Sequence, residues 1–178
     1  NLYGFGDRVF FAFYGVQFYF VKLLLPFGLS AFHAFPLKTG GSLPAQFYAS
    51  PVFSLILVAI VYFAKSFRKE LIFGFGFFFI NIALVIQIIP FGETVVAERY
   101  TYLSYIGLFY LIAQFYIWVV DGKFSFGKNW GNAMRYIYIG VGLFFAVLAF
   151  NQTRTWENGL TMFKDAYKKY PYNLSVLS

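Results

Sequence analysis

The stretch 100–120, YTYLSYIGLFYLIAQFYIWVV, contains no charged side chain and is apolar or aromatic along most of its length. A helix needs about 20 predominantly apolar residues to cross roughly 30 Å of bilayer hydrocarbon. This stretch therefore predicts a membrane-spanning helix. It decides the fold class because several other stretches of the chain have the same character.

Further apolar runs of similar length lie on both sides of it, and each ends at a proline, a glycine or a charge cluster. Hydrophobic residues make up 60% of the chain and charged residues 12%, against about 45–50% and 25% in soluble domains. We predict an all-α, polytopic transmembrane helix bundle in residues 1–150 with about five spans. These lie near 9–25, 47–64, 71–89, 100–120 and 134–150.

The basic residues predict an orientation, because loops on the cytoplasmic side are enriched in lysine and arginine. The expected cytoplasmic side carries Arg8, Lys65, Arg68, Lys69, Lys123, Lys128 and Arg135. The opposite side carries Lys38 and Arg99 in its loops, with Lys22 and Arg154 at helix ends. Loops 26–50 and 90–99, and all residues after 151, are therefore expected to face outward. This is the periplasm for a bacterial inner-membrane protein, the expected location, or the lumen of the endoplasmic reticulum for a eukaryotic one.

The net charge of +7 does not indicate a nucleic-acid partner, because the basic residues fall in short loops rather than on one face. The chain has no cysteine, so disulfides and thiolate metal sites are excluded. The sole histidine, His33, has no nearby metal-ligating residue in the sequence, and we expect it to make a hydrogen bond within its loop. No metal site is predicted.

The tail, 151–178, has a different character. Residues 155–170 place Trp156, Leu160, Phe163 and Tyr167 at helical spacing, and the other face is rich in lysine. We predict an amphipathic helix outside the membrane. A helix of this kind could also lie flat on the membrane surface.

The outward segment 90–102, PFGETVVAERYTY, carries the chemistry that the sequence offers. It brings Glu93, Glu98 and Arg99 to the mouth of a membrane bundle, where charged groups are costly and often functional. Arg99 could bind a lipid-linked phosphate with its planar guanidinium, or it could form a structural ion pair with one of the two glutamates. Lys22, near the end of its helix, could reach the headgroups or supply a second phosphate contact, and the former is favoured.

Three sequence motifs together resemble a known family. They are AERYTYLSYIG at 97–107, Arg154-Thr155-Trp156, and a predicted helix ending at Tyr170-Pro171-Tyr172-Asn173. These motifs are similar to the junction between membrane domain and repeats in tetratricopeptide-repeat-containing GT-C glycosyltransferases, which include the transmembrane and tetratricopeptide-repeat O-mannosyltransferases. Ser104 stands where that family commonly has proline. The resemblance implies that residues 151–178 begin a tetratricopeptide repeat.

The resemblance also implies a function, namely transfer of a sugar from a polyprenyl-phosphate carrier to an acceptor, often a protein Ser or Thr hydroxyl, on the outer face of the membrane. Arg99, Glu98, Tyr102, Glu93 and Lys22 would contact the lipid phosphate or substrate. The repeats would recruit an acceptor or partner protein. The lipid-linked sugar is the donor; the sequence supports no other cofactor and no divalent metal.

The catalytic acidic residues of that family lie in an earlier outward loop that this sequence lacks. Since the chain opens at Asn1 without methionine, we expect it to be an internal piece of a longer protein and inactive alone. The competing hypothesis is a non-catalytic membrane anchor whose repeats serve as a scaffold in an envelope complex.

Overall fold

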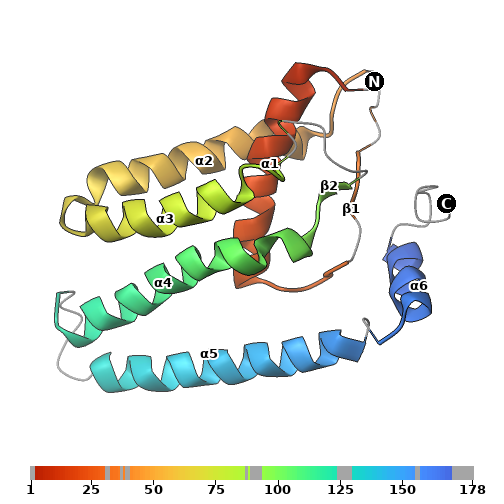
Figure 1. The fold of residues 1–178 in the computed structure, drawn as a ribbon. Coiled ribbons are helices and arrows are strands. Elements are labelled where there is room, and N and C mark those ends of the chain that lie inside the picture. The colour runs from red at the N-terminus through yellow and green to blue at the C-terminus, as the bar shows by residue number, and fades with distance from the viewer. Residues whose placement is uncertain are drawn as a thin grey trace.

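The structure is a computed structural model and describes residues 3–30, 33–36, 38, 41–86, 88, 94–123, 130–154 and 157–169. The described chain is mostly helical, with four long helices lying lengthwise and a further helix running across them (Figure 1). In order, the elements are α1 (Phe5–Leu24), β1 (His33–Ala34), α2 (Ala45–Phe63), the short 3-10 helix η1 (Lys65–Phe67), α3 (Arg68–Ile82), β2 (Thr94–Val96), the 3-10 helix η2 (Glu98–Tyr100), α4 (Thr101–Val120), α5 (Trp130–Thr153) and α6 (Gly159–Lys169).

Three helical segments are long and apolar enough to cross a membrane, namely Ala45–Phe63, Glu98–Val120 and Ala133–Thr153. Large apolar side chains project from them without protein cover, including Leu55 at 67% exposure and Leu143 at 65%. An apolar surface on this scale is rare on a soluble monomer and is expected where lipid covers the protein. The predicted membrane character is therefore supported, and three of the five predicted spans coincide with a helix that is long and apolar enough to cross a membrane.

The predicted span at 71–89 differs from the helix observed there. Helix α3 begins at Arg68 and ends at Ile82, so it has 15 residues. At 1.5 Å per residue this is about 22 Å, less than the roughly 30 Å of bilayer hydrocarbon. The chain turns after Ile82, where the amides of Val85 and Ile86 bond back to its carbonyl oxygen. The apolar run thus continues beyond the helix.

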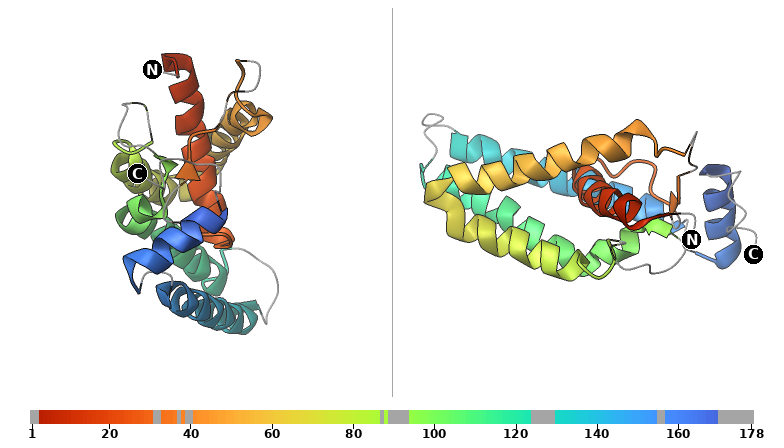
Figure 2. Two further views of the ribbon diagram at one scale, coloured as in Figure 1. Left: turned by 90° about the vertical axis from the view of Figure 1, so that its right-hand side faces the viewer. Right: turned by 90° about the horizontal axis from the view of Figure 1, so that it is seen from above.

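Helix α1 runs across the other helices instead of beside them, and the views in Figures 1 and 2 agree on this. One face, formed by Phe11, Ala12, Gly15, Val16 and Tyr19, is buried in the bundle. The ring of Phe11 contacts that of Phe47 on α2 at a centroid distance of 5.5 Å. The residues of this face therefore pack in the protein core, and hydropathy alone does not distinguish such a core helix from a membrane span.

The first turn of α1 lies beside the loop that follows this helix. The Asp7 carboxylate accepts hydrogen bonds from the Gly4 amide at 2.8 Å and from Lys38 Nζ at 2.7 Å. Tyr3 donates to the carbonyl of Pro36 at 2.9 Å. Arg8, beside Asp7, and Lys38 therefore lie at the same end of α1, and their predicted placement on opposite sides of the membrane is wrong, because the loop after α1 runs back to the first turn of this helix.

The Asp7 pair predicts a pH dependence, since the hydrogen bond from Lys38 lowers the pKa of the Asp7 carboxyl. A lowered folded-state pKa contributes stability above the ordinary value of about 3.9, and this stability is lost as pH falls through the folded pKa. Asp7→Asn should therefore reduce the difference in melting temperature between neutral pH and pH of about 3. Asp121→Asn, at the far end of α4, is the control. Equal pH dependence in Asp7→Asn and the unaltered chain would contradict this role.

Helices α3 and α4 make the closest helix contact, and two glycines allow it. A Cβ added at Gly74 would lie 2.9 Å from the carbonyl oxygen of Gly107, and one added at Gly107 would meet the Gly74 carbonyl oxygen even more closely. Small residues at such crossings let helix backbones approach in membrane proteins. Beyond this contact, the rings of Phe67 and Trp118 pack at 4.0 Å, which places the α2–α3 corner beside the end of α4.

The all-α prediction needs a small correction. Strands β1 and β2 form an antiparallel ladder that pairs His33 with Val96 and Ala34 with Thr94, with an irregularity between the two pairs. Val95 and Val96 are buried in the core that α1 covers. The ladder joins the 26–50 loop to the segment that leads into α4.

Helix α6 confirms the existence of a helix in the tail, although it begins later than predicted. Asn158 starts it, since Asn158 Oδ1 accepts the amide of Thr161 at 2.9 Å and Thr161 Oγ1 accepts the amide of Asn158 at 3.3 Å. Leu160 and Tyr167 on its apolar stripe are 65% and 48% exposed. Trp156 lies outside the described residues. The assignment of this helix to a tetratricopeptide repeat, and the boundary at 150, remain predictions.

Candidate functional site

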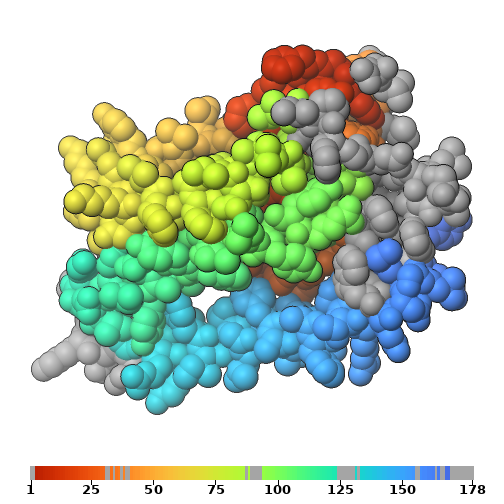
Figure 3. Space-filling model, in the orientation of Figure 1, coloured from red at the N-terminus to blue at the C-terminus, as the bar shows by residue number. Residues whose placement is uncertain are grey.

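Two adjoining cavities lie where α1, α4 and α5 meet. The larger, of about 1020 Å³, lies between α4 and α5 and reaches the last turn of α1. The smaller, of about 200 Å³, lies against η2 and the loop after α1. Both are lined by Lys22, Pro26, Leu29, Tyr102, Tyr105 and Gln152. The shared lining makes them parts of one site, and Figure 3 shows the opening between α4 and α5.

The walls of the larger cavity come from one face of each helix. On α4 the lining residues are Tyr102, Tyr105 and Phe109, spaced by three and four, and α5 contributes Gly142, Phe145 and Ala149 at the same spacing. Residues spaced in this way lie on one side of a helix. A Cβ added at Gly142 would meet no atom within 4 Å, so this glycine opens onto space.

Polarity changes along the site. Phe109, Gly142 and Phe145 line the part nearer the middle of α4 and α5, whereas Asn151, Gln152 and Thr153 come from the last turn of α5. The smaller cavity adds the charged residues Glu98 and Arg99. The site is therefore a trough with an apolar floor and a polar, positively charged mouth.

Lys22 lines both cavities at the mouth. Its Nζ donates to the carbonyl oxygens of Phe27 and Gly28 and lies 5.4 Å from the centroid of the Phe18 ring. Gly28 has a φ of 62° in this turn, a conformation that glycine adopts without strain. The ammonium group thus holds the turn after α1 and also faces the trough. The sequence favoured extension toward the lipid headgroups and did not indicate these contacts with the turn.

Arg99 and Tyr102 flank the mouth from η2 and the start of α4. The Arg99 guanidinium lies 5.3 Å from the centroid of the Tyr100 ring, a cation–π distance. Both Arg99 and Tyr102 line the smaller cavity, and Tyr102 is 79% exposed. The guanidinium can therefore reach a ligand at the mouth.

Glu98 has a structural partner that the sequence did not indicate. Its Oε1 lies 2.7 Å from Nε2 of His33 and accepts the amide of Ser30 at 3.2 Å. His33 is buried, and its ring packs edge-on against Phe18 at 4.8 Å. His33 thus makes a hydrogen bond, but its partner is Glu98 of another segment and not a group within its own loop, and this bond fastens the 26–50 loop to the start of η2.

A second tie fixes the same region to α1. The hydroxyl of the fully buried Tyr19 donates to the carbonyl of Ala97 at 3.4 Å and accepts its amide at 3.3 Å. The Tyr105 hydroxyl in turn donates to the backbone carbonyl of Tyr19 at 2.7 Å. These bonds hold the trough walls from α1 and α4 in fixed register, as a preformed ligand site requires.

The structure brings together four of the five predicted site residues, namely Lys22, Glu98, Arg99 and Tyr102. Glu93 lies outside the described residues. The prediction missed Tyr105 and Phe109, which follow Tyr102 on α4. It also missed Gly142, Phe145 and Gln152, because helix α5 comes from a distant part of the chain. Only the three-and-four spacing of Gly142, Phe145 and Ala149 could have indicated them.

Among the residues that the structure describes, no group of three or more His, Asp or Glu side chains could hold a metal ion. No protein-family model, no curated protein and no solved structure matches this chain.

Proposed function

We propose that this chain binds a polyprenyl-phosphate-linked sugar and serves a membrane glycosyltransferase that passes the sugar to an acceptor, such as a protein Ser or Thr, on the outer face of the membrane. The observation that carries the proposal is the trough with its apolar floor and charged mouth. A polyprenyl phosphate has the matching order of parts, a long apolar chain and one anionic head.

The mouth suits the phosphate. Lys22 and Arg99 contribute positive charge, and a guanidinium can offer a phosphate two parallel hydrogen bonds. The Glu98 carboxylate is engaged by His33 and the Ser30 amide. Its interactions with loop groups limit its repulsion of an incoming anion. Glu98 therefore acts in this proposal as a positioning residue for η2, which carries Arg99.

The proposal includes an orientation in which the trough mouth faces the periplasm or the lumen. Lys65, Arg68 and Lys69 lie at the corner between α2 and α3, at the other end of the long helices (Figure 1). The positive-inside rule assigns such a corner to the cytoplasm, even after Arg8 is removed from that side. Helix α6 lies at the end that carries β1 and β2, so it would share the side of the mouth.

Arg99→Ala tests the proposed phosphate contact. Hydrogen bonds to charged groups contribute about 1.5–3 kcal/mol, which corresponds to a loss of about 10- to 100-fold in affinity. The variant should lose this much affinity for undecaprenyl phosphate in detergent micelles and little for undecaprenol, which lacks the phosphate. Arg154→Ala removes a nearby charge that does not line either cavity, and it should bind as the unaltered chain does.

Equal losses in Arg99→Ala and Arg154→Ala would indicate general charge attraction and would contradict the contact.

The alternative, a membrane-anchored scaffold, is favoured by one observation, the exposed apolar stripe of α6 with Leu160 and Tyr167. A scaffold predicts no selective affinity for undecaprenyl phosphate over undecaprenol. The affinities of the unaltered chain for undecaprenyl phosphate and for undecaprenol therefore separate the two functions.

A further inference from the structure

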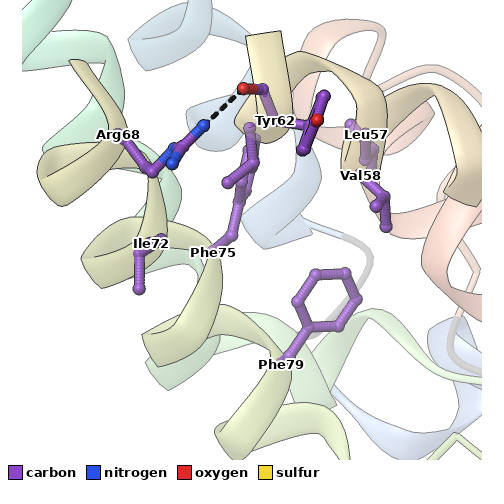
Figure 4. A pocket seen from close by; sticks show the side chains of 8 residues that line it. Leu57, Val58, Tyr62, Arg68, Ile72, Phe75 and Phe79 are labelled. Atoms are coloured by element: carbon purple, nitrogen blue, oxygen red, sulfur yellow. Dashed lines mark hydrogen bonds between the residues drawn. The ribbon is translucent and has the colours of Figure 1, made fainter. Parts of the chain in front are cut away.

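A second groove lies between α2 and α3, away from the trough. It has a volume of about 440 Å³. Among the described residues its apolar lining is Leu57, Val58, Val61, Tyr62, Ile72, Phe75 and Phe79, and its one charged lining residue is Arg68. Figure 4 shows Phe75 and Phe79 along one wall and Leu57 and Val58 on the other. Val58 and Tyr62 are each 66% exposed, so the groove is open on its outer side.

Arg68 stands at one end of this groove as the first residue of α3. Its Nη2 donates to the carbonyl of Tyr62 at 2.6 Å, and its guanidinium lies 5.9 Å from the centroid of the Tyr62 ring. Its Nε is buried and has no hydrogen-bond partner within the described part of the chain. The guanidinium is thus oriented by α2 and still has donor capacity.

No carboxylate of the described residues forms an ion pair with Arg68. Lys65 and Lys69 add two exposed positive charges at the same corner, and Glu70 contributes the single negative charge of the segment 65–70. A cation at the edge of an apolar membrane surface is costly without an anionic partner. The local charge therefore favours an anion at Arg68.

We propose that the α2–α3 groove binds one anionic phospholipid, with its phosphate at Arg68 and an acyl chain along Phe75 and Phe79. The Arg68 guanidinium selects an anionic head over a zwitterionic one, and the apolar groove between two helices holds the chain. This groove is separate from the trough. The proposed lipid binding therefore does not depend on whether the chain serves a glycosyltransferase.

Native mass spectrometry of the full chain, released from phosphatidylcholine nanodiscs containing a minor fraction of phosphatidylglycerol, tests the head contact. The unaltered chain should retain one phosphatidylglycerol in excess over its share of the bilayer. Arg68→Gln should reduce this enrichment by about tenfold, since charge-assisted hydrogen bonds to phosphate are lost. Lys65→Gln and Lys69→Gln, which remove exposed charges of the same sign, should keep most of it.

A second pair of variants tests the groove. Val58→Phe should fill it and displace the lipid, whereas Leu55→Phe adds the same ring on the same helix outside the lining and should have no effect. Retention of phosphatidylcholine and phosphatidylglycerol in bilayer proportion would overturn the proposal. So would equal losses in the three charge variants, or full retention by Val58→Phe.

Discussion

Gly142→Phe is expected to lower the affinity of the chain for undecaprenyl phosphate by about 100-fold. Gly142 lines the trough, and a Cβ at this position would meet no neighbouring atom within 4 Å. A phenylalanine therefore fits without disturbing α5 and fills the space between α4 and α5. Displacing three or four methylene groups, at about 0.8 kcal/mol each, accounts for a loss of this size.

Gly140→Phe is the matched control for this prediction. Gly140 also lies on α5, and a Cβ there also meets nothing within 4 Å, but Gly140 does not line the trough. The control should bind undecaprenyl phosphate as the unaltered chain does, measured by titration in the same detergent. If the two variants bound equally well, the isoprenoid chain would not lie between α4 and α5.

Gly107→Ala is expected to lower the free energy of unfolding by about 1–3 kcal/mol, the usual cost of overpacking. The added methyl group would meet the Gly74 carbonyl oxygen and would lie 3.1 Å from the Phe78 amide nitrogen. Both are backbone atoms, so the contact cannot be relieved by a side-chain rotation, and α3 and α4 must separate.

Gly76→Ala is the control on α3, two residues and about 200° around the helix from Gly74, where a Cβ meets nothing within 4 Å. Alanine is favoured over glycine in helices by up to about 1 kcal/mol, so this variant should be as stable as the unaltered chain or more stable. Unfolding in mixed micelles with increasing sodium dodecyl sulfate measures both. A Gly107→Ala variant as stable as Gly76→Ala would show that the close helix contact contributes nothing to stability.

Three of the four helices that lie lengthwise, α2, α4 and α5, could be predicted well from the sequence. The predicted spans at 47–64 and 100–120 agree with α2 and α4 to within two residues at each end. Uninterrupted apolar runs carry this information because the membrane solvent demands them over a fixed length. The run at 134–150 also corresponds to α5, which extends several residues beyond it on both sides.

The direction of α1 could not be predicted in the same way. One face of this helix packs against protein, with Phe11 and Tyr19 at 1% and 0% exposure. Hydropathy measures only that a side chain avoids water, and a core and a bilayer satisfy it equally. The contact between Asp7 and Lys38, which reveals the direction, joins residues on separate elements and has no local pattern.

The candidate site could be predicted only in part, because part of it depends on contacts between distant segments of the chain. Arg99 and Glu98 stand in a charged segment beside an apolar helix, and such contrast is visible in a sequence. The His33 partner of Glu98 is 65 positions away, and the strands that bring them together have two and three residues. Strands this short show no alternation, so the ladder and the contact it creates depend on tertiary packing.

Photolabelling tests most directly whether the trough between α4 and α5 holds a polyprenyl phosphate. An undecaprenyl phosphate that carries a diazirine in its isoprenoid chain would be irradiated with the full chain in micelles, and the adducts mapped by mass spectrometry. The proposal predicts adducts on Phe109, Phe145 and Leu148, which disappear when unlabelled undecaprenyl phosphate competes. Adducts spread over exposed residues outside the trough, such as Leu55 and Ile80, and unaffected by competition, would contradict it.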